Sequence, residues 1–324
     1  METQSRNDIK LVSETTVSPL PRVDISSLTP ETFYQRYLKT GIPLIITGLM
    51  ESEGDWNLDY LCEKFSNQEF IFRNPGSEKY KHDKRKWKSI GSGVALQIMP
   101  FTEYAEMLRN HKAHENDINL GKFPLKNTTL ADTHALKIIG ERLGLTKAAS
   151  ELNIYVAPGG HSSGLHYDSL DGTLMQMHGA KKVVLFPPSQ TYNLYPFPVY
   201  NHLLYGLKVR SWFSQVYPEK PDFKTFPKLK EALQHKCEVI LNQGETLYIP
   251  AGWWHEVIAL GDEMVCAVNR FWRVHPRSRA VFSWNRWRAG CGIICASPYM
   301  FLSLAIAACS SNRKQNLTKI SHRV

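Results

Sequence analysis

The sequence "ELNIYVAPGGHSSGLHYDSLDGTLMQMHGAKKVVLFPP", residues 151–188, decides the fold. It contains short apolar runs, "NIYVAP", "TLMQM" and "VVLF", that are separated by turns rich in glycine, serine and proline. Similar runs follow as far as about residue 275 in "CEVILNQGETLYIP", "HEVIAL" and "EMVCAVNRFW". Short strands at this regular spacing are typical of an all-β barrel or jelly roll. We therefore predict a β-core over residues 151–275.

The regions on either side of this core have different sequence patterns. Residues 1–20 are polar, and we expect a flexible tail there. Residues 21–150 mix helical and extended patterns, so they form a predicted N-terminal α/β region that supplies flanking helices and strands. Within it, Thr29 is placed to cap a helix, and "GIPLIITGL" (41–49) predicts a buried strand. Residues 276–324 form a predicted C-terminal helical segment, and the expected fold class is mainly β with flanking helices.

Composition narrows the function only a little. A chain of 324 residues can bury a large core, and its formal charge of +9 would attract acidic partners without specifying any of them. The six cysteines include no CxxC pair, which argues against a zinc ribbon or a redox motif. Because no apolar run opens the chain, we see no secretory signal and expect a cytoplasmic location.

The stretch 77–89 is strongly basic. Its cationic residues are Lys79, Lys81, Lys84, Arg85, Lys86 and Lys88. Such a patch could bind an acidic substrate or an RNA backbone. Because only one tryptophan and one tyrosine are interleaved, which is too few for a stacking platform, we interpret the stretch as a solvated loop. Binding of nucleic acid is not required by the sequence.

An uncharged stretch runs from Ala289 to Asn312. It is long enough to cross a bilayer, for which about 20 residues suffice. It contains Pro298, glycines and serines, however, and basic residues flank both of its ends, so no orientation is indicated. A buried or subunit-contact helix is one interpretation, with residues 276–310 as a candidate contact of a homodimer. A membrane anchor through 289–312 is the other.

Two polar residues in the opening stretch have the spacing of metal ligands. On an extended chain His166 and Asp168 project to the same face, since side chains alternate. A third ligand is available in "NQGETLYIPAGWWHEV", where His255 follows a strand and a turn. In an antiparallel barrel this later strand can return beside the earlier one. Two imidazoles and one carboxylate form the facial triad of non-haem Fe(II) oxygenases, which leaves coordination positions open for a co-substrate and O2.

An open iron site of this kind needs an oxidisable co-substrate, and a dicarboxylic 2-oxo acid would serve. Its remote carboxylate would need an anchor inside the barrel. Lys181 begins the strand "KKVVLF", and a lysine that points inward is costly unless it meets an anion. We therefore predict that Lys181 anchors the co-substrate and that Lys182 faces outward.

At this point the sequence resembles the JmjC and cupin-like Fe(II)- and 2-oxoglutarate-dependent oxygenases, in particular the branch around the factor-inhibiting-HIF asparaginyl hydroxylase. The resemblance covers about residues 150–275. The motifs that carry it are "HYD", "GAKKVVLFPPSQTYNLYPFPV", "SQVYPEKPDFKTFP", "GETLYIPAGWWHEV" and "VNRFW". It implies a double-stranded β-helix (a jelly roll) with the metal at one mouth.

The resemblance also implies roles for single residues. It makes His166, Asp168 and His255 the iron ligands and Lys181 the anchor of 2-oxoglutarate. It further places Ser163 beside that anchor, Asn269 near the co-substrate or the ligands, with Arg270 as an equally good match in an ungapped alignment, and Trp272 in the pocket near iron.

The chain departs from this relative at several positions. Gly172 replaces an asparagine near the co-substrate, and "NLGKFPL" replaces a strand that usually supplies a tyrosine. Trp212 and Phe213 stand where the relative has polar residues that read the substrate, so we expect both to line the substrate pocket. A shared chemistry therefore does not imply a shared target.

Three functions remain open from the sequence. The first, favoured by the resemblance, is an oxidoreductase of the dioxygenase class that hydroxylates an unactivated C–H bond of a protein side chain. The second is a hydroxylase or desaturase of a small molecule or lipid, which the aromatic pair and the apolar C-terminal stretch favour. The third is a non-catalytic cupin that binds metal.

Overall fold

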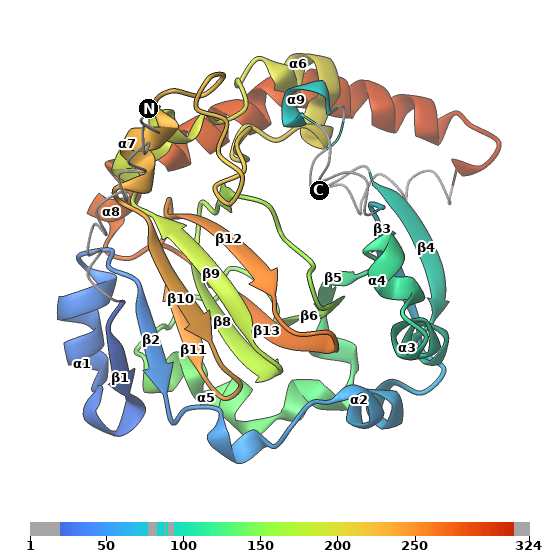
Figure 1. Ribbon diagram of the computed structural model, residues 1–324, viewed down its shortest axis with the longest axis vertical. Helices are drawn as coiled ribbons and strands as arrows, with labels where there is room; N and C mark the ends of the chain where they lie inside the picture. Colours follow the sequence, from blue (N-terminus) through green and yellow to red (C-terminus); the bar gives the residue numbers. More distant parts are fainter. Residues whose placement is uncertain (1–19, 77–82, 88, 90–93, 314–324) are drawn as a thin grey trace, which may run out of the picture.

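A computed structural model describes residues 20–76, 83–87, 89 and 94–313 (Figure 1). Its strands are β1 (Arg22–Asp24), β2 (Leu44–Thr47), β3 (Glu69–Asn74), β4 (Ala95–Pro100), β5 (Leu120–Pro124), β6 (Asn153–Pro158), β7 (His166–Tyr167), β8 (Asp171–His178), β9 (Lys181–Phe186), β10 (Cys237–Leu241), β11 (Thr246–Ile249), β12 (Trp254–Ala259) and β13 (Met264–Trp272). Its helices are α1 (Pro30–Phe33), α2 (Leu58–Phe65), α3 (Phe101–Arg109), α4 (Lys112–Asn116), α5 (His134–Arg142), α6 (Asn201–Tyr205), α7 (Leu229–Leu233), α8 (Arg277–Val281) and α9 (Trp284–Ala308).

Two β-sheets form the centre of the fold. The larger sheet has the strand order β1-β2-β11-β8-β13-β6-β5, and the smaller one has the order β10-β9-β12-β7. Except for the parallel pair β1 and β2, the neighbouring strands of these two sheets run antiparallel. The interleaved order of early and late strands is that of a jelly roll, so the predicted fold class is confirmed. Strands β1, β2 and β5 come from the N-terminal region and extend the larger sheet.

Apolar side chains from both sheets pack together where β9 and β10 face β8 and β11. There Val183 and Leu185 from β9 contact Leu174 from β8 and Leu247 from β11. A second and larger core covers the outer face of the larger sheet, where α1, α2 and α5 pack (Figure 1). The candidate site lies beside this packing, in a cavity that Leu174 and Ile249 also line.

The N-terminal elements follow the sequence signals closely. The Thr29 hydroxyl accepts a hydrogen bond from the Thr32 backbone N–H at 3.1 Å, as expected of the residue that caps a helix, and Pro30 occupies the first turn. The run "LIIT" forms β2, which is almost wholly buried. Both predictions are confirmed.

The basic stretch is only partly described, because residues 77–82 and 88 lie outside the described residues. Within the described part, Lys84 does not fit a solvated loop. It is 2% exposed, and its Nζ donates a hydrogen bond to the Val216 carbonyl at 2.8 Å and lies 4.1 Å from the Tyr217 ring centroid. The neighbouring Arg85 is exposed and pairs with Asp83, as expected of a solvated residue. The prediction of a solvated loop was therefore wrong for Lys84, which joins this segment to the loop around residue 216.

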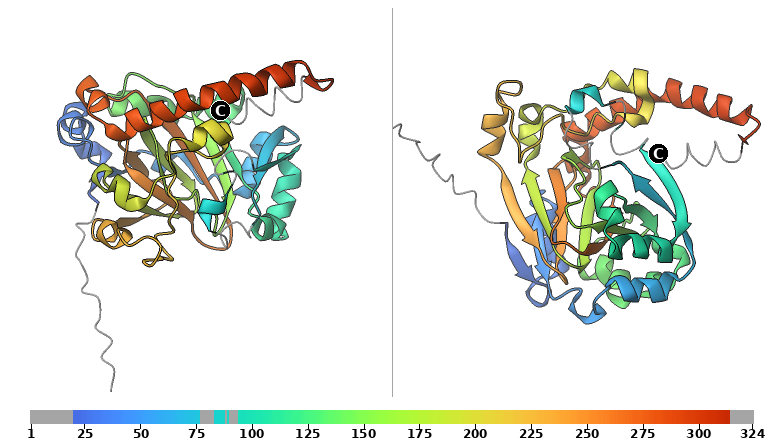
Figure 2. Two further views of the ribbon diagram at one scale, coloured as in Figure 1. Left: turned by 90° about the horizontal axis from the view of Figure 1, so that it is seen from above. Right: turned by 45° about the vertical axis from the view of Figure 1, so that its right-hand side comes forward.

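Helix α9 extends along one side of the molecule and continues past the rest of the fold (Figure 2). Its small residues Gly292 and Ala296 are buried or closely approached, and it packs against α6, whereas Ile294, Phe301 and Leu302 are exposed. Among the described residues it is one helix whose length and apolar composition would suffice to cross a membrane. The predicted dimer contact and the predicted membrane anchor both stay predictions.

A buried ion pair joins α8 to the larger sheet. Asp171, at the start of β8, is fully buried and accepts hydrogen bonds from Arg279 Nη1 and Nη2 at 3.0 and 2.9 Å. The same carboxylate accepts a hydrogen bond from the Ala251 backbone N–H at 2.8 Å. Asp171 therefore fixes the turn that leads into β12.

We expect Arg279→Met to lower the free energy of unfolding by about 3–5 kcal/mol, because it leaves the Asp171 carboxylate buried without its counter-charge. The measurement is urea unfolding followed by fluorescence. Arg109→Met is the matched control, since Arg109 pairs with Asp59 at the surface and should cost less than about 1 kcal/mol. Equally small losses in the two variants would contradict the structural role of the buried pair.

Candidate metal centre

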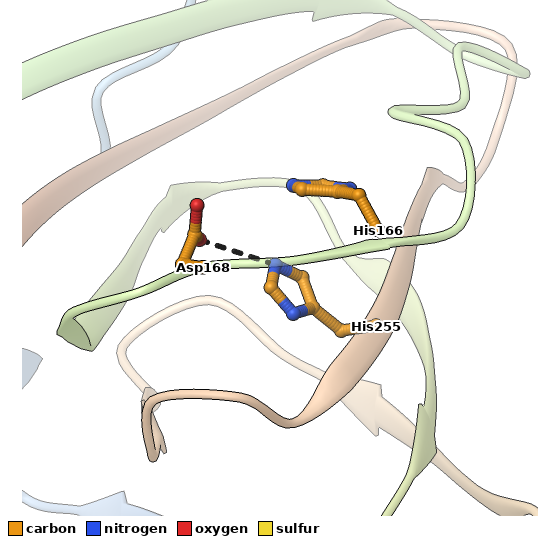
Figure 3. Close-up of side chains that lie close together, drawn as sticks. All are labelled: His166, Asp168 and His255. Carbon is orange, nitrogen blue, oxygen red and sulfur yellow. Dashed lines mark ion pairs between the residues drawn. The ribbon is translucent and has the colours of Figure 1, made fainter. Parts of the chain in front are cut away.

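The three predicted ligands converge because of strand pairing (Figure 3). Strand β7 pairs antiparallel with β12, and in this register His166 lies directly opposite His255. Asp168 follows two residues later, so that its side chain returns to the face of His166. The intervening Tyr167 points to the other face, where it is buried against Trp254 with 4.7 Å between ring centroids.

The distances are those of a single small site. One possible ligand atom from each of the three residues lies within 4.8 Å of the others. His255 Nε2 lies 3.5 Å from Asp168 Oδ2, and the two imidazole centroids are 4.4 Å apart. A metal bound at roughly 2.1 Å from each ligand requires only a small further approach of these groups.

Hydrogen bonds to the backbone orient both imidazoles. His166 Nδ1 lies 2.8 Å from the Gly164 carbonyl, and His255 Nδ1 lies 3.1 Å from the Trp253 carbonyl. A carbonyl oxygen only accepts, so each Nδ1 carries the proton and each Nε2 keeps a free lone pair. Burial, together with the neighbouring His255, lowers the pKa of His166 to about 4. A neutral imidazole is the form that binds a metal.

The donor set fits a divalent transition metal. Neutral nitrogen donors suit iron, zinc and copper, while a carboxylate adds one negative charge and suits harder ions. His255 is 4% exposed and Asp168 remains open to the cavity, so three ligands lie on one side of the site and space remains on the other. The residues therefore fit Fe(II) in the facial arrangement that was predicted.

Lys181 lies on the inner face of β9. It is 7% exposed, and burial lowers its pKa to about 8. Its strand neighbours are Ala259 on β12 and Leu241 on β10. Lys182 faces the other way and pairs with Glu219 at 3.0 Å. The alternation that we predicted is thus present, and Lys181 lines the same cavity as the three ligands.

Two residues that the resemblance assigned to the co-substrate also line this cavity. The Ser163 hydroxyl accepts a hydrogen bond from the Val257 backbone N–H at 3.0 Å. Asn269 faces the cavity from β13, and its Oδ1 is buried without a hydrogen-bond partner among the described residues. Arg270 lies on the opposite face of that strand, with its guanidinium 5.0 Å from the Trp272 ring centroid, so the structure favours Asn269 over Arg270.

The aromatic residues of the predicted pocket separate into two groups. Phe213 stacks on His166 with 4.8 Å between ring centroids and an angle of 15° between ring planes, and Trp212 lines the same cavity. Trp272 is not brought there. It packs in the core outside the larger sheet, where Gly140 leaves room for it, and its Nε1 donates a hydrogen bond to Thr173 Oγ1 at 3.1 Å. Phe271, one residue earlier, faces the cavity instead, because side chains alternate along β13.

The cavity that holds these residues has a volume of about 730 Å³. This is within the usual range for sites that bind small molecules or single side chains. Sequence reasoning missed several residues that line it: Arg73, Lys122, Tyr155, His161 and Arg210. For Arg210 the sequence did offer a signal, because in "VRSWF" it stands two positions before the aromatic pair that was predicted to line the pocket. The others come from the N-terminal region or from between the motifs, where the sequence pattern does not indicate which face they occupy.

Comparisons with known proteins agree with this site. Residues 30–278 match the family described as a cupin-like domain. The chain is 27% identical over 293 residues to "Lysine-specific demethylase JMJ31" of Arabidopsis thaliana, which covers 79% of this chain and 50% of that protein. It is 25% identical over 276 residues to human "tRNA wybutosine-synthesizing protein 5", and the match covers 80% of this chain and 79% of that protein. It is 30% identical over 248 residues to "JmjC domain-containing protein D" of Dictyostelium discoideum, with 71% and 52% covered.

The chain belongs to the cupin-like domain family, and its relatives place it among the JmjC proteins. This is a family of oxygenases of the Fe(II)- and 2-oxoglutarate-dependent type, and the chain carries a His-Asp-His site of the kind that such enzymes use. The narrower resemblance to the asparaginyl hydroxylase branch is not specifically supported. The chain spans about half the length of the Arabidopsis and Dictyostelium relatives.

We expect Asp168→Ala to weaken binding of Mn(II), a stable substitute for Fe(II), by a hundredfold or more. Loss even of a group that orients a ligand costs roughly 10–100-fold, and Asp168 would itself be a ligand. Titration calorimetry measures the affinity. His161→Ala is the matched control, because His161 lines the same cavity but is held by Asp117 at 2.6 Å. Similar losses in the two variants would argue against the assigned ligand set.

We also expect Lys181→Met to stabilise the protein at neutral pH. Below about pH 8 the Lys181 ammonium is charged in both the folded and the unfolded state, so the folded protein carries the full cost of burying it. Replacement should raise the free energy of unfolding by roughly 2–3 kcal/mol at pH 7. The gain should shrink as pH rises above 8, since the folded wild type then loses the proton that the unfolded chain still binds. Urea unfolding at pH 7 and 9.5 tests this, with Lys182→Met as the control that should show no such gain.

Proposed function

We propose that this protein is an Fe(II)- and 2-oxoglutarate-dependent oxygenase that hydroxylates an unactivated C–H bond, with a protein side chain as the substrate. The observation that carries the proposal is the presence of His166, Asp168 and His255 in one cavity with the buried cation of Lys181. An inward lysine without a carboxylate partner among the described residues is costly, and a dicarboxylic co-substrate would remove that cost.

Each residue of the cavity then has a task. His166, Asp168 and His255 would hold the metal, and when bound, iron supplies the activation of O2. Lys181 would bind the remote carboxylate of 2-oxoglutarate, and Ser163 and Asn269 are close enough to the cavity to add hydrogen bonds. Phe213 covers one face of the His166 imidazole and excludes water from it. The protein therefore contributes orientation and a dry surrounding for one C–H bond.

The relatives and the lining of the cavity bear on the nature of the substrate. The names of the relatives include lysine-specific demethylases and a tRNA wybutosine-synthesizing protein, so that related chains act on protein or on RNA. A small molecule or lipid is the second candidate, favoured by the apolar faces of Trp212 and Phe213 in the cavity. A non-catalytic cupin is the third, and the assay below separates it from the other two.

We expect the wild-type protein to convert 2-oxoglutarate to succinate in the presence of Fe(II) and O2, and Asp168→Ala to reduce this rate at least a hundredfold. His178→Gln, outside the cavity, is the matched control and should retain the wild-type rate. If the wild type produces no succinate even with cell extract as the source of substrate, the chain is a binding protein and the proposal fails. Mass spectrometry of the peptide and metabolite fractions, searched for a gain of one oxygen, then separates the first two substrate classes.

A further inference from the structure

Besides Lys84, which is held by the Val216 carbonyl, three cationic side chains line the cavity and have no part in holding the metal or 2-oxoglutarate. They are Arg73 at the end of β3, Lys122 on β5, and Arg210 in the segment that follows the short 3-10 helix Gly206–Lys208. They come from three elements that are far apart in sequence, so the fold brings them together. We call them the cationic cluster.

The backbone at Lys122 is bent in a way that directs this side chain. The pairing of β5 with β6 shifts between Leu120 and Phe123, so that Gly121 and Lys122 together oppose the single residue Tyr155. This is a β-bulge, and Lys122 takes the left-handed conformation there with φ of +56°. A non-glycine residue in that conformation costs free energy, and such strain is found preferentially at functional sites.

The neighbouring glycine makes room for the arginine of the cluster. A Cβ atom on Gly121 would lie 3.4 Å from Arg73 Nη1, so the guanidinium rests directly against this backbone. Among the described residues, neither the Arg73 guanidinium nor the Lys122 ammonium has a salt-bridge partner. Arg210 is held above the Trp212 ring, 5.6 Å from its centroid, and it donates a hydrogen bond to the Leu207 carbonyl.

The cations of the cluster lower one another's pKa. Burial first, and then the other two cations, lower the pKa of Lys122, while burial and Arg73 lower the pKa of Arg210 to about 10. The Asp168 carboxylate raises the pKa of both Lys122 and Arg210. It is the only carboxylate among the described residues that line the cavity.

The cluster is distinct from the predicted anchor of the co-substrate. Lys181 lies on β9 in the smaller sheet, whereas Lys122 lies on β5 at the edge of the larger sheet. Tyr155 lines the cavity beside the cluster, because it is the β6 residue opposite Gly121 and Lys122. The cavity therefore offers two separate positive regions, one on the Lys181 side and one on the Asp168 side.

We propose that Arg73, Lys122 and Arg210 form the substrate subsite and bind a carboxylate or phosphate group of the substrate. This inference rests on the proposed function, and it names the chemical class of the substrate rather than its source. An anion held on the Asp168 side would place the adjoining carbons beside the metal position, while Lys181 holds the co-substrate. Three cations and the Tyr155 hydroxyl would provide charge-assisted hydrogen bonds that bind and orient the substrate.

The test measures binding of inorganic phosphate and of acetate to the full chain by titration calorimetry. Mn(II) and 2-oxoglutarate are present at saturation without O2, so that Lys181 is already occupied. We expect Arg73→Gln and Lys122→Gln each to weaken binding of the preferred anion roughly tenfold or more, with the affinity for 2-oxoglutarate changed less than twofold. Arg73→Lys keeps the charge and should keep most of the binding. Lys126→Gln, an exposed lysine four residues beyond Lys122, is the matched control and should have no effect.

Preference for phosphate or for acetate would decide between a phosphorylated and a carboxylate-bearing substrate, and either result supports the subsite. Binding of neither anion, or binding that Arg73→Gln and Lys122→Gln leave unchanged, overturns it. Urea unfolding of each variant establishes that a loss of binding is not a loss of fold. The binding test is independent of the succinate assay. The proposed subsite can therefore be refuted while the proposed oxygenase activity is confirmed, and the activity can be refuted while the subsite is confirmed.

Discussion

The whole site depends on the register between β7 and β12. His166 and His255 are 89 positions apart in sequence, and they meet because these two residues are direct partners in one antiparallel ladder. A slip of one residue would turn His166 and Asp168 away from the cavity and place Tyr167 in it. The register is held on the far side of the strands, where Tyr167 packs against Trp254, and by the Asp171 carboxylate that fixes the turn before β12.

Apolar packing stabilises the sandwich beside the cavity. Leucine and valine side chains from both sheets fill the space beside β9, while the cavity is lined by cations, imidazoles, apolar side chains and, within the described part of the chain, a single carboxylate. The Lys181 ammonium opposes folding, since it is buried and has no carboxylate partner among the described residues. The apolar packing on both faces of the larger sheet offsets this cost. Helix α9 contributes as well, since its Arg288 donates hydrogen bonds to the Ser211 and Phe197 carbonyls and so holds the segment that carries Arg210 and Phe213.

The sequence was sufficient for those features that follow from strand periodicity and local motifs. The core strands, the cap at Thr29, the convergence of the three ligands and the inward Lys181 all come from alternation or from spacing. The errors arise where tertiary packing decides. Alternation along β13 could not be phased from the sequence alone, so Trp272 was expected where Phe271 lies. Lys84 lies in a run of basic residues, yet it is buried because the carbonyl of Val216 is there to accept its hydrogen bond. Nothing in "NLGKFPL" indicates a bulge that brings a lysine to the cavity.

The cavity has two positive regions, and each is expected to bind a different anion. One cation would suffice to anchor a dicarboxylic co-substrate, and Lys181 is the buried lysine on the inner face of β9. A second group of cations on the Asp168 side would compete for the same co-substrate unless its own ligand were already bound or its geometry were wrong for a 2-oxo acid. Separation by the metal site resolves the conflict, because an anion on each side of the metal position feels little repulsion from the other. The charge pattern of the cavity thus favours the binding of two different anions, one in each region. It does not favour the binding of 2-oxoglutarate in both regions.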